Sequence, residues 1–287
     1  MSTVKQISKS LKWETFITHR GSLSRDAPAG KEHLKWVPNT VTLISGEKDA
    51  VLVDVFLTID TSKQLVDWVA ASGKSLTTIY ITHAHGDHFF GLQPVLDRFP
   101  QARVIARPEV VEAMRQHISP ESIEGFWNKL FPGQIAERLH VAEALDGDGF
   151  ELEGHSLIAV GVGHTDTDNT TCLHIPSIDL VVAGDAVYNG VHLYLGETDA
   201  TGRRDWIAAL DKIAALRPAA VIAGHKAPGT DDEPRIIAET RKYIEDFERL
   251  CSETTHAGEL YSRMLDLHSN RLNPGSLWTA AKAAKPA

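Results

Sequence analysis

The sequence has few cysteines and no long apolar run. Only two of the 287 residues are cysteines, Cys172 and Cys251. Two cysteines cannot form the disulfide framework of a small secreted domain, so we expect both to be reduced thiols. No run approaches the roughly 20 apolar residues that a membrane helix needs. The first residues, MSTVKQISKSLKWETF, hold no apolar segment typical of a signal peptide. These absences predict a cytoplasmic protein without a membrane partner.

The chain also has fewer basic than acidic residues. The chain has 29 lysines and arginines against 38 acidic residues, which gives a formal net charge of −9. A field of that sign repels phosphate backbones, and no basic cluster reverses it locally, so we expect no nucleic-acid partner. Hydrophobic residues make up 43% of the chain, which is ordinary for a globular protein. We expect one domain over residues 1–287, with its core at about 13–230.

Strand and helix patterns alternate along the first half of the chain. Residues 40–45 and 50–55 are short apolar runs joined by a turn sequence, which predicts a hairpin. Helical spacing over 62–72 ends at Gly73. Residues 76–82 are apolar and β-branched, as in a buried strand. Two helical stretches over about 108–135 are broken by prolines, and we interpret them as an insertion over the main body.

The second half continues the alternation. The sequence predicts strands at about 155–162, 171–175, 180–183 and 219–223, a helix at 203–216, and a C-terminal helical segment over about 231–287. The pattern itself is helical from 231 to about 268, and it predicts no definite element for the tail from Asn273 onward. Strands alternating with helices, with hairpins between them, favour an α/β layered fold.

Four ligand-type side chains directly follow the strand 76–82. They are His83, His85, Asp87 and His88. A loop that leaves the end of a strand can aim several side chains at one point, and Gly86 permits the tight turn. Imidazole nitrogens and carboxylates suit zinc and similar divalent ions. Because neighbouring residues diverge, one ion cannot easily take all four side chains, whereas two adjacent ions can.

Three further ligand-type residues each follow a glycine just past a predicted strand. They are His164, Asp185 and His225. Taken singly, a histidine at a strand end is usually structural, and a Gly-Asp pair is usually a turn. It is improbable by chance that four predicted strands each end at a histidine or aspartate. We therefore expect His164, Asp185 and His225 to join the metal site.

The segment THAHGDH resembles the signature of the metallo-β-lactamase superfamily, and the resemblance extends over roughly residues 40–230. It implies an αββα four-layer sandwich, here with the helical insertion and the C-terminal helices. It implies two divalent ions, with Zn²⁺ expected and Fe, Mn or Co as alternatives. It also implies that His83, His85 and His164 bind the first ion, that Asp87, His88 and His225 bind the second, and that Asp185 bridges both.

One stretch departs from the superfamily's pattern. The residues after His164 are Thr-Asp-Thr-Asp-Asn, which is more acidic than usual. We expect a solvated loop there. The alternative is that Asp166 or Asp168 places an extra carboxylate near the metals.

The ligand set predicts hydrolysis by a hydroxide that bridges the two ions and attacks a carbonyl, with Asp87 as general base. The segment around Tyr188 resembles that of acyl-homoserine lactone lactonases, where the matching tyrosine donates to the substrate carbonyl oxygen; a packed core aromatic is the alternative. We therefore expect hydrolysis of a lactone or carboxylic ester. The alternatives are a glyoxalase II-like thioester hydrolase, then a β-lactamase, and, outside the enzymes, a catalytically silent metal-binding protein.

A small-molecule acyl substrate is the expected partner, and a homodimer is a further expectation. Aromatic residues near the ligand loop could line an acyl pocket or pack the core, and His192 could reach the substrate or serve the structure. The candidate substrate residues are Phe89, Phe90, Phe126, Trp127, Phe131 and His192.

Overall fold

The first sheet is built around the predicted hairpin. The computed structural model describes residues 10–28, 30 and 36–285. Strands β2 (Trp36–Ser45) and β3 (Asp49–Val53) pair antiparallel, and β4 (Ser75–Tyr80) and β5 (Arg103–Ala106) extend the sheet in parallel. With β1 (Lys12–Gly21) and β6 (Glu143–Ala144), the sheet has the order β1-β2-β3-β4-β5-β6.

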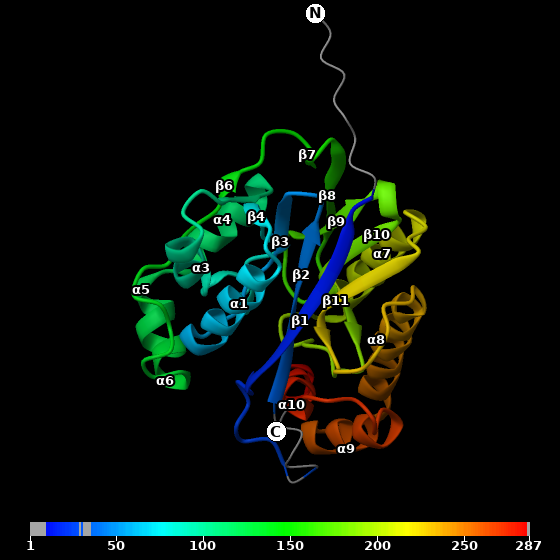
Figure 1. Ribbon diagram of the computed structural model, residues 1–287. Coiled ribbons are helices and arrows are strands. Elements are labelled where there is room, and N and C mark those ends of the chain that lie inside the picture. Colours follow the sequence, from blue (N-terminus) through cyan, green and yellow to red (C-terminus); the bar gives the residue numbers. More distant parts are fainter. Residues whose placement is uncertain (1–9, 29, 31–35, 286–287) are drawn as a thin grey trace, which may run out of the picture. The chain divides into compact units, whose positions relative to one another are not determined.

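Helix α1 (Ile59–Ala71) begins earlier than the apolar spacing predicts. The reason is its N-cap, because the Thr58 side chain accepts a hydrogen bond from the Thr61 backbone N–H. Leu65 and Val69 are fully buried. The helix contacts α3 (Leu92–Arg98), which follows the ligand loop and the short helix α2 (Gly86–Phe89). Figure 1 shows α1 in cyan and α3 in blue-green.

The stretch predicted as a helical insertion is helical and broken where the prolines indicate. It contains α4 (Pro108–His117), α5 (Pro120–Ser122), the π-helix η2 (Ile123–Trp127) and α6 (Asn128–Leu130). The Ser119 side chain accepts from the Ser122 backbone N–H and so restarts the helix after the break. That this stretch is an insertion remains a prediction.

The second sheet has five strands in the order β11-β10-β9-β8-β7. They are β7 (Gly149–Leu152), β8 (His155–Gly163), β9 (Thr170–Ile175), β10 (Leu180–Asn189) and β11 (Ala220–Lys226), with the 3-10 turn η3 (Pro176–Ile178) before β10. The predicted end of β10 at residue 183 is wrong, because the strand continues through Asp185 and Tyr188. Strand β11 likewise runs past the predicted end and includes His225.

Side chains of the two sheets meet at Tyr80. This tyrosine of β4 is fully buried. Its hydroxyl is 2.7 Å from Thr171 Oγ1 on β9, and its ring stacks on Phe150 of β7 at 6.1 Å. Two sheets with several helices, matched by the solved relatives reported below, confirm the predicted α/β fold class.

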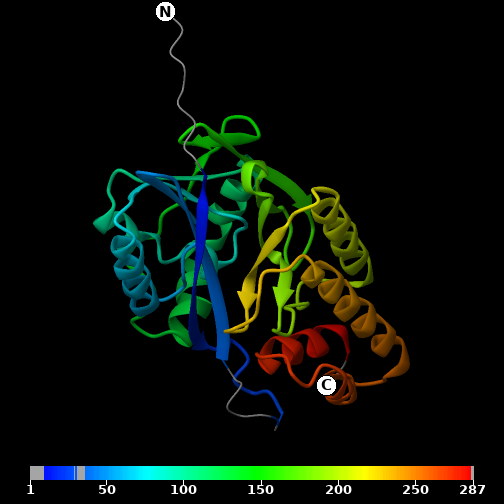
Figure 2. The same ribbon diagram turned by 45° about the vertical axis from the view of Figure 1, so that its right-hand side comes forward.

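The C-terminal half is rich in long helices. They are α7 (Ala200–Ala215), α8 (Arg235–Glu253), α9 (Ala257–Leu267) and α10 (Pro274–Ala284). Helix α7 is joined to β10 by the Trp206 indole N–H, which donates to the carbonyl of Ala186 at 2.8 Å. Figure 2 shows α8, α9 and α10 following one another from orange to red. The tail, for which the sequence pattern predicts no definite element, therefore forms a helix up to Ala284.

The chain divides into two compact units. Unit 1 takes the chain up to Phe16, Val41–Gly161 and Thr171–Val182, and unit 2 takes Ile17–Thr40, Val162–Thr170 and the chain from Ala183. The expectation of a single domain with a core at about 13–230 remains a prediction. Within the described ranges, no helix has both the length and the apolar character needed to cross a membrane.

Candidate metal centre

The ligand loop of unit 1 lies between β4 and α2. His83, Asp87 and His88 are buried, whereas His85 is half-buried. The ring of His83 lies 5.0 Å from that of His85 and 4.2 Å from that of His88, between centroids. The loop therefore gathers three imidazoles into one small volume, as the spacing of the motif predicts.

Asp54 orients this loop through three hydrogen bonds. Its Oδ2 accepts from His88 Nδ1 at 3.0 Å and from the Thr82 hydroxyl at 2.7 Å, and its Oδ1 accepts from the Thr82 backbone N–H at 2.8 Å. A carboxylate on Nδ1 fixes the tautomer of His88 and leaves Nε2 as the ligand atom. His83 follows the same pattern, with its Nδ1 3.0 Å from the Thr82 hydroxyl oxygen.

Sequence reasoning missed Asp54. Its signal is a carboxylate directly after the apolar strand β3, where a buried charge needs an explanation. The residue is 2% exposed and has a φ of 61°. A non-glycine residue in the left-handed region often marks a functional position.

Two neighbouring strands carry ligand candidates in unit 2. Asp185 lies on β10 and His225 on β11, and His225 Nε2 is 2.9 Å from Asp185 Oδ2. His225 Nδ1 donates to the Pro38 carbonyl at 2.7 Å, which again directs Nε2 to a ligand role. Gly224 leaves room for the carboxylate, because a Cβ there would lie 2.0 Å from Asp185 Oδ1.

Tyr188 belongs to the same group. It is 1% exposed, and its hydroxyl donates to Asp185 Oδ2 at 2.8 Å. Its ring stacks on His225 at 5.3 Å. This tyrosine therefore touches two ligand candidates, and the donation of its hydroxyl to the substrate remains a prediction.

The turn after β8 places its acidic residues differently from the expected solvated loop. Asp166 is fully buried, so the expectation is wrong for this residue. Asp168 is exposed and accepts from His164 Nδ1 at 2.6 Å. His164 Nε2 lies beside Gly202 at the start of α7, where a Cβ would be only 2.5 Å away. A cavity of about 390 Å³ with acidic side chains opens at this place.

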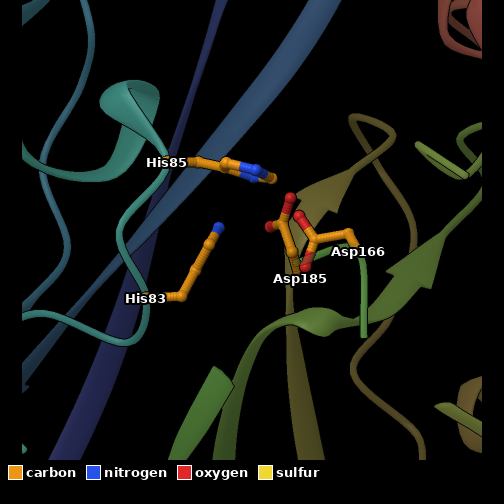
Figure 3. A group of neighbouring side chains, drawn as sticks. All are labelled: His83, His85, Asp166 and Asp185. Carbon is orange, nitrogen blue, oxygen red and sulfur yellow. The ribbon is translucent and has the colours of Figure 1, made fainter. Parts of the chain in front are cut away.

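Two groups of side chains offer ligand atoms that lie within 4.8 Å of one another. The first is His83, His85, Asp166 and Asp185, drawn in Figure 3, and the second is Asp87, His88 and His225. Six of the seven predicted ligands occur in these groups. The seventh, His164, does not, and its assignment to the first ion remains a prediction.

Of the five aromatic candidates, four are buried and one is exposed. Phe89 and Phe90 are fully buried, and Phe90 packs against Trp127 at 5.2 Å. A Cβ at Gly86 would lie 2.8 Å from the Phe90 ring, so this ring supports the ligand loop. Phe131 stacks on Trp127 at 6.3 Å and is buried. Phe126 is 47% exposed. Contact of these aromatic candidates with a substrate remains a prediction.

Three other residues, His192, His117 and Cys172, are in neither group of close ligand atoms. His192 is fully buried, and its Nδ1 is 2.9 Å from the Tyr243 hydroxyl on α8, which favours a structural role; contact with substrate remains a prediction. The ring centroid of His117 lies 6.0 Å from that of His85. Burial raises the pKa of the Cys172 thiol to about 12, so the thiol is protonated at neutral pH.

Comparisons with known proteins identify the family of this chain. Residues 34–225, about two thirds of the chain, match the model of the metallo-beta-lactamase superfamily. The chain belongs to this superfamily. Among solved structures, a metallo-beta-lactamase family protein from Thermus thermophilus superposes with a TM-score of 0.64 at 21% identity, covering 94% of this chain and 91% of that one.

Other relatives have a lower structural similarity or match only part of this chain. A metallo-beta-lactamase from Pontibacter korlensis superposes with a TM-score of 0.59 at 15% identity, covering 84% of this chain and 97% of that one. At such identities the likeness shows the fold alone. A hydroxyacylglutathione hydrolase from Actinobacillus pleuropneumoniae is 29% identical over 135 residues, which are 46% of this chain and 55% of the relative. The match thus spans about half of that curated relative. Superfamily membership and this relative together support a metal-dependent hydrolase.

Proposed function

We propose that this chain hydrolyses a lactone or carboxylic ester with two divalent ions. The observation that carries the proposal is the Tyr188 hydroxyl, held 2.8 Å from the carboxylate of Asp185 beside His225. This placement puts a potential oxyanion donor next to the ligand candidates. The predicted cofactor, two divalent ions with zinc as the expected metal, belongs to the same proposal.

The donor chemistry fits such ions. His88 and His225 each have Nδ1 engaged by an oxygen acceptor, which orients Nε2 as a ligand atom. Asp185 is 2% exposed, and buried carboxylates are normally paired or bound to a cation. When bound, a pair of divalent ions would lower the pKa of water to near neutrality and polarise a substrate carbonyl.

The remaining steps fall to the chain's own residues. Asp87 is 6% exposed on α2 and is proposed as the general base that holds the proton removed from water. Tyr188 would turn its single hydroxyl proton from Asp185 to the oxygen of the carbonyl under attack. Asp54 would keep His88 in place throughout, and Phe126 would meet the acyl group.

Thioester hydrolysis is the second candidate. It is supported by the partial match to a hydroxyacylglutathione hydrolase. Hydroxide attack on the carbonyl is common to both reactions, and the resemblance around Tyr188 is what ranks the lactone or ester first. β-Lactam hydrolysis has only the fold in its favour.

A substrate panel tests the proposal. The metal-reconstituted chain would be assayed on lactones, aryl esters, thioesters, β-lactams and phosphoesters, with and without a chelator. We expect chelator-sensitive turnover, highest on lactones or esters. A preference for thioesters would select the second candidate. A fully loaded protein that is inert to every acyl substrate would favour the non-catalytic metal-binding alternative.

Tyr188→Phe tests whether this tyrosine donates to the substrate or holds Asp185 in place. We expect the ions to stay bound while the turnover rate falls about 10-fold to 1000-fold, the range for the loss of one oxyanion donor. The measurements are metal content per chain and kcat on the best substrate of the panel. Tyr80→Phe is the matched control, because it removes a buried hydroxyl that bonds to Thr171 on β9. An unchanged rate removes Tyr188 from the mechanism, and lost metal would instead assign it to holding Asp185.

A further inference from the structure

The turn after β8 and the start of α7 hold the ring of His164 at both of its nitrogens. Both elements lie in unit 2. His164 Nδ1 donates to Asp168 Oδ1 at 2.6 Å, four residues further along the turn. At the other end of the ring, Nε2 lies against Gly202, the third residue of α7, where a Cβ would be only 2.5 Å away. The ring therefore has a charged acceptor on one nitrogen and a close steric contact at the other.

Hydrogen bonds within the turn keep Asp168 in place. The Thr165 backbone N–H donates to the Thr167 carbonyl at 2.9 Å. The Thr170 hydroxyl donates to the same carbonyl at 3.2 Å, and its oxygen lies 2.7 Å from Thr165 Oγ1. These contacts fix the backbone on both sides of Asp168, so its carboxylate stays beside His164.

The exposure of the two side chains differs greatly. The Asp168 side chain is 80% exposed, whereas that of His164 is 19% exposed. Exposed ion pairs contribute little to the stability of a fold, so this contact is not needed to hold the core together. His164 Nε2 is buried and forms no hydrogen bond within the described residues. A buried nitrogen normally has a partner, and a metal ion fits one on an imidazole whose Nδ1 is held by a carboxylate.

We propose that Asp168 is a positioning residue that holds His164 in the orientation of a metal ligand. This role rests on the metal dependence of the proposed function. The acidic departure of the turn from the superfamily's pattern places a charged acceptor on the imidazole, and charged acceptors form stronger hydrogen bonds than neutral ones. Such an acceptor fixes the proton on Nδ1 and makes Nε2 a better donor to a metal. Asp168 thus acts on the ion through His164.

Substitutions of Asp168 test the role without any substrate. The full chain would be titrated with Zn²⁺ against a competing chelator. For Asp168→Ala we expect one of the two ions to bind about 10-fold to 100-fold more weakly, as for other outer partners of ligating histidines. Asp168→Asn keeps an acceptor oxygen without the charge, so its affinity should lie between those of the wild type and Asp168→Ala.

Asp205→Ala is the matched control. Asp205 is an exposed carboxylate on α7 that lines the same cavity as Asp168 and His164. Its removal takes away the same charge but leaves the Nδ1 contact intact, so we expect no loss of affinity. If Asp168→Ala bound both ions as tightly as Asp205→Ala does, the positioning role would be overturned.

A double-mutant cycle shows whether Asp168 acts through His164. In a His164→Ala background, Asp168→Ala should cause no further loss of metal affinity, because no ring remains to be oriented. An equal loss with and without His164 would mean that the carboxylate acts on the ion by its charge alone. That result would also overturn the positioning role.

Gly202→Ala disturbs the other end of the ring without changing the turn. The methyl group would displace Nε2, while alanine favours a helix more than glycine does, so α7 should stay folded. We expect the same ion to bind at least about 10-fold more weakly. Gly258→Ala in α9 is the control, because no atom lies within 4 Å of its added methyl group.

The visible absorption of the Co²⁺-loaded chains provides a readout that a folding defect does not mimic, since it reports the geometry of the bound ion. We expect a changed spectrum for Asp168→Ala and Gly202→Ala and an unchanged one for both controls, with the same circular dichroism throughout. If Gly202→Ala kept the affinity and spectrum of the wild type, Nε2 would not occupy this position when the ion is bound. Asp168 could not then hold it there.

The outcomes distinguish this role from the proposed function. If Asp168→Ala weakens one ion but the wild-type chain cleaves no acyl substrate, the positioning role stands and the lactonase proposal fails. If the wild-type chain cleaves lactones and Asp168→Ala binds both ions like the wild type, the lactonase proposal stands and the positioning role fails.

Discussion

Replacing His85 with alanine is expected to abolish hydrolysis, with a rate loss of about 1000-fold or more, the scale of losing a group essential to the reaction. The physical reason is the removal of an imidazole from the group of close ligand atoms on the loop after β4. His85 is half-buried, so its truncation should leave the core intact. Metal content per chain and turnover on the best acyl substrate would be measured together.

The control for His85→Ala is His174→Ala. His174 is a half-buried histidine on β9 and is not a ligand candidate. Full metal content and rate are expected for this variant. If His85→Ala kept both ions and its turnover, the ligand loop would not be the metal site, and the proposed mechanism would have to be abandoned.

Substitution of Asp54 is expected to weaken both metal binding and the fold. Asparagine tolerates the left-handed backbone conformation of residue 54. Its side chain has one acceptor oxygen instead of two, so at least one of the three hydrogen bonds that Asp54 accepts is lost. We expect metal affinity to fall by about 10-fold to 100-fold, as for other outer partners of ligating histidines. Because a buried donor is left unsatisfied, the free energy of unfolding should fall by about 1–3 kcal/mol.

Asp54→Ala should be worse than Asp54→Asn on both measures. It leaves Thr82 and His88 without their acceptor and also strains the backbone at a φ of 61°. Chelator competition and urea denaturation of the metal-free chains would provide the two readouts. Equal affinity in wild type and both variants would mean that His88 needs no such support, and the role assigned to Asp54 would be lost.

The ligand loop could be predicted from the sequence because its chemistry is local. His83, His85, Asp87 and His88 are close along the chain, so a single strand end is enough to gather them. The hairpin of β2 and β3 is equally local, since the turn residues and the apolar runs adjoin each other. Patterns of this kind need no knowledge of distant contacts.

Other features depend on partners far away in the sequence. The run around Asp185 resembles a turn after a strand, yet β10 continues because β9 and β11 flank it in the sheet. Asp166 has the sequence context of a polar loop, and its burial depends on where the turn packs. Asp54 has a sequence signal, but its partners Thr82 and His88 can be recognised only in the folded chain. In each case tertiary contacts outweigh the local preference.

Gly224 has a consequence for variation at this site. The residue has no functional atom, yet any side chain on it would collide with Asp185 Oδ1. Even a single methyl group would have to displace the carboxylate or move β11 away from β10. In a saturation-mutagenesis screen, position 224 would therefore behave as though it were itself a ligand.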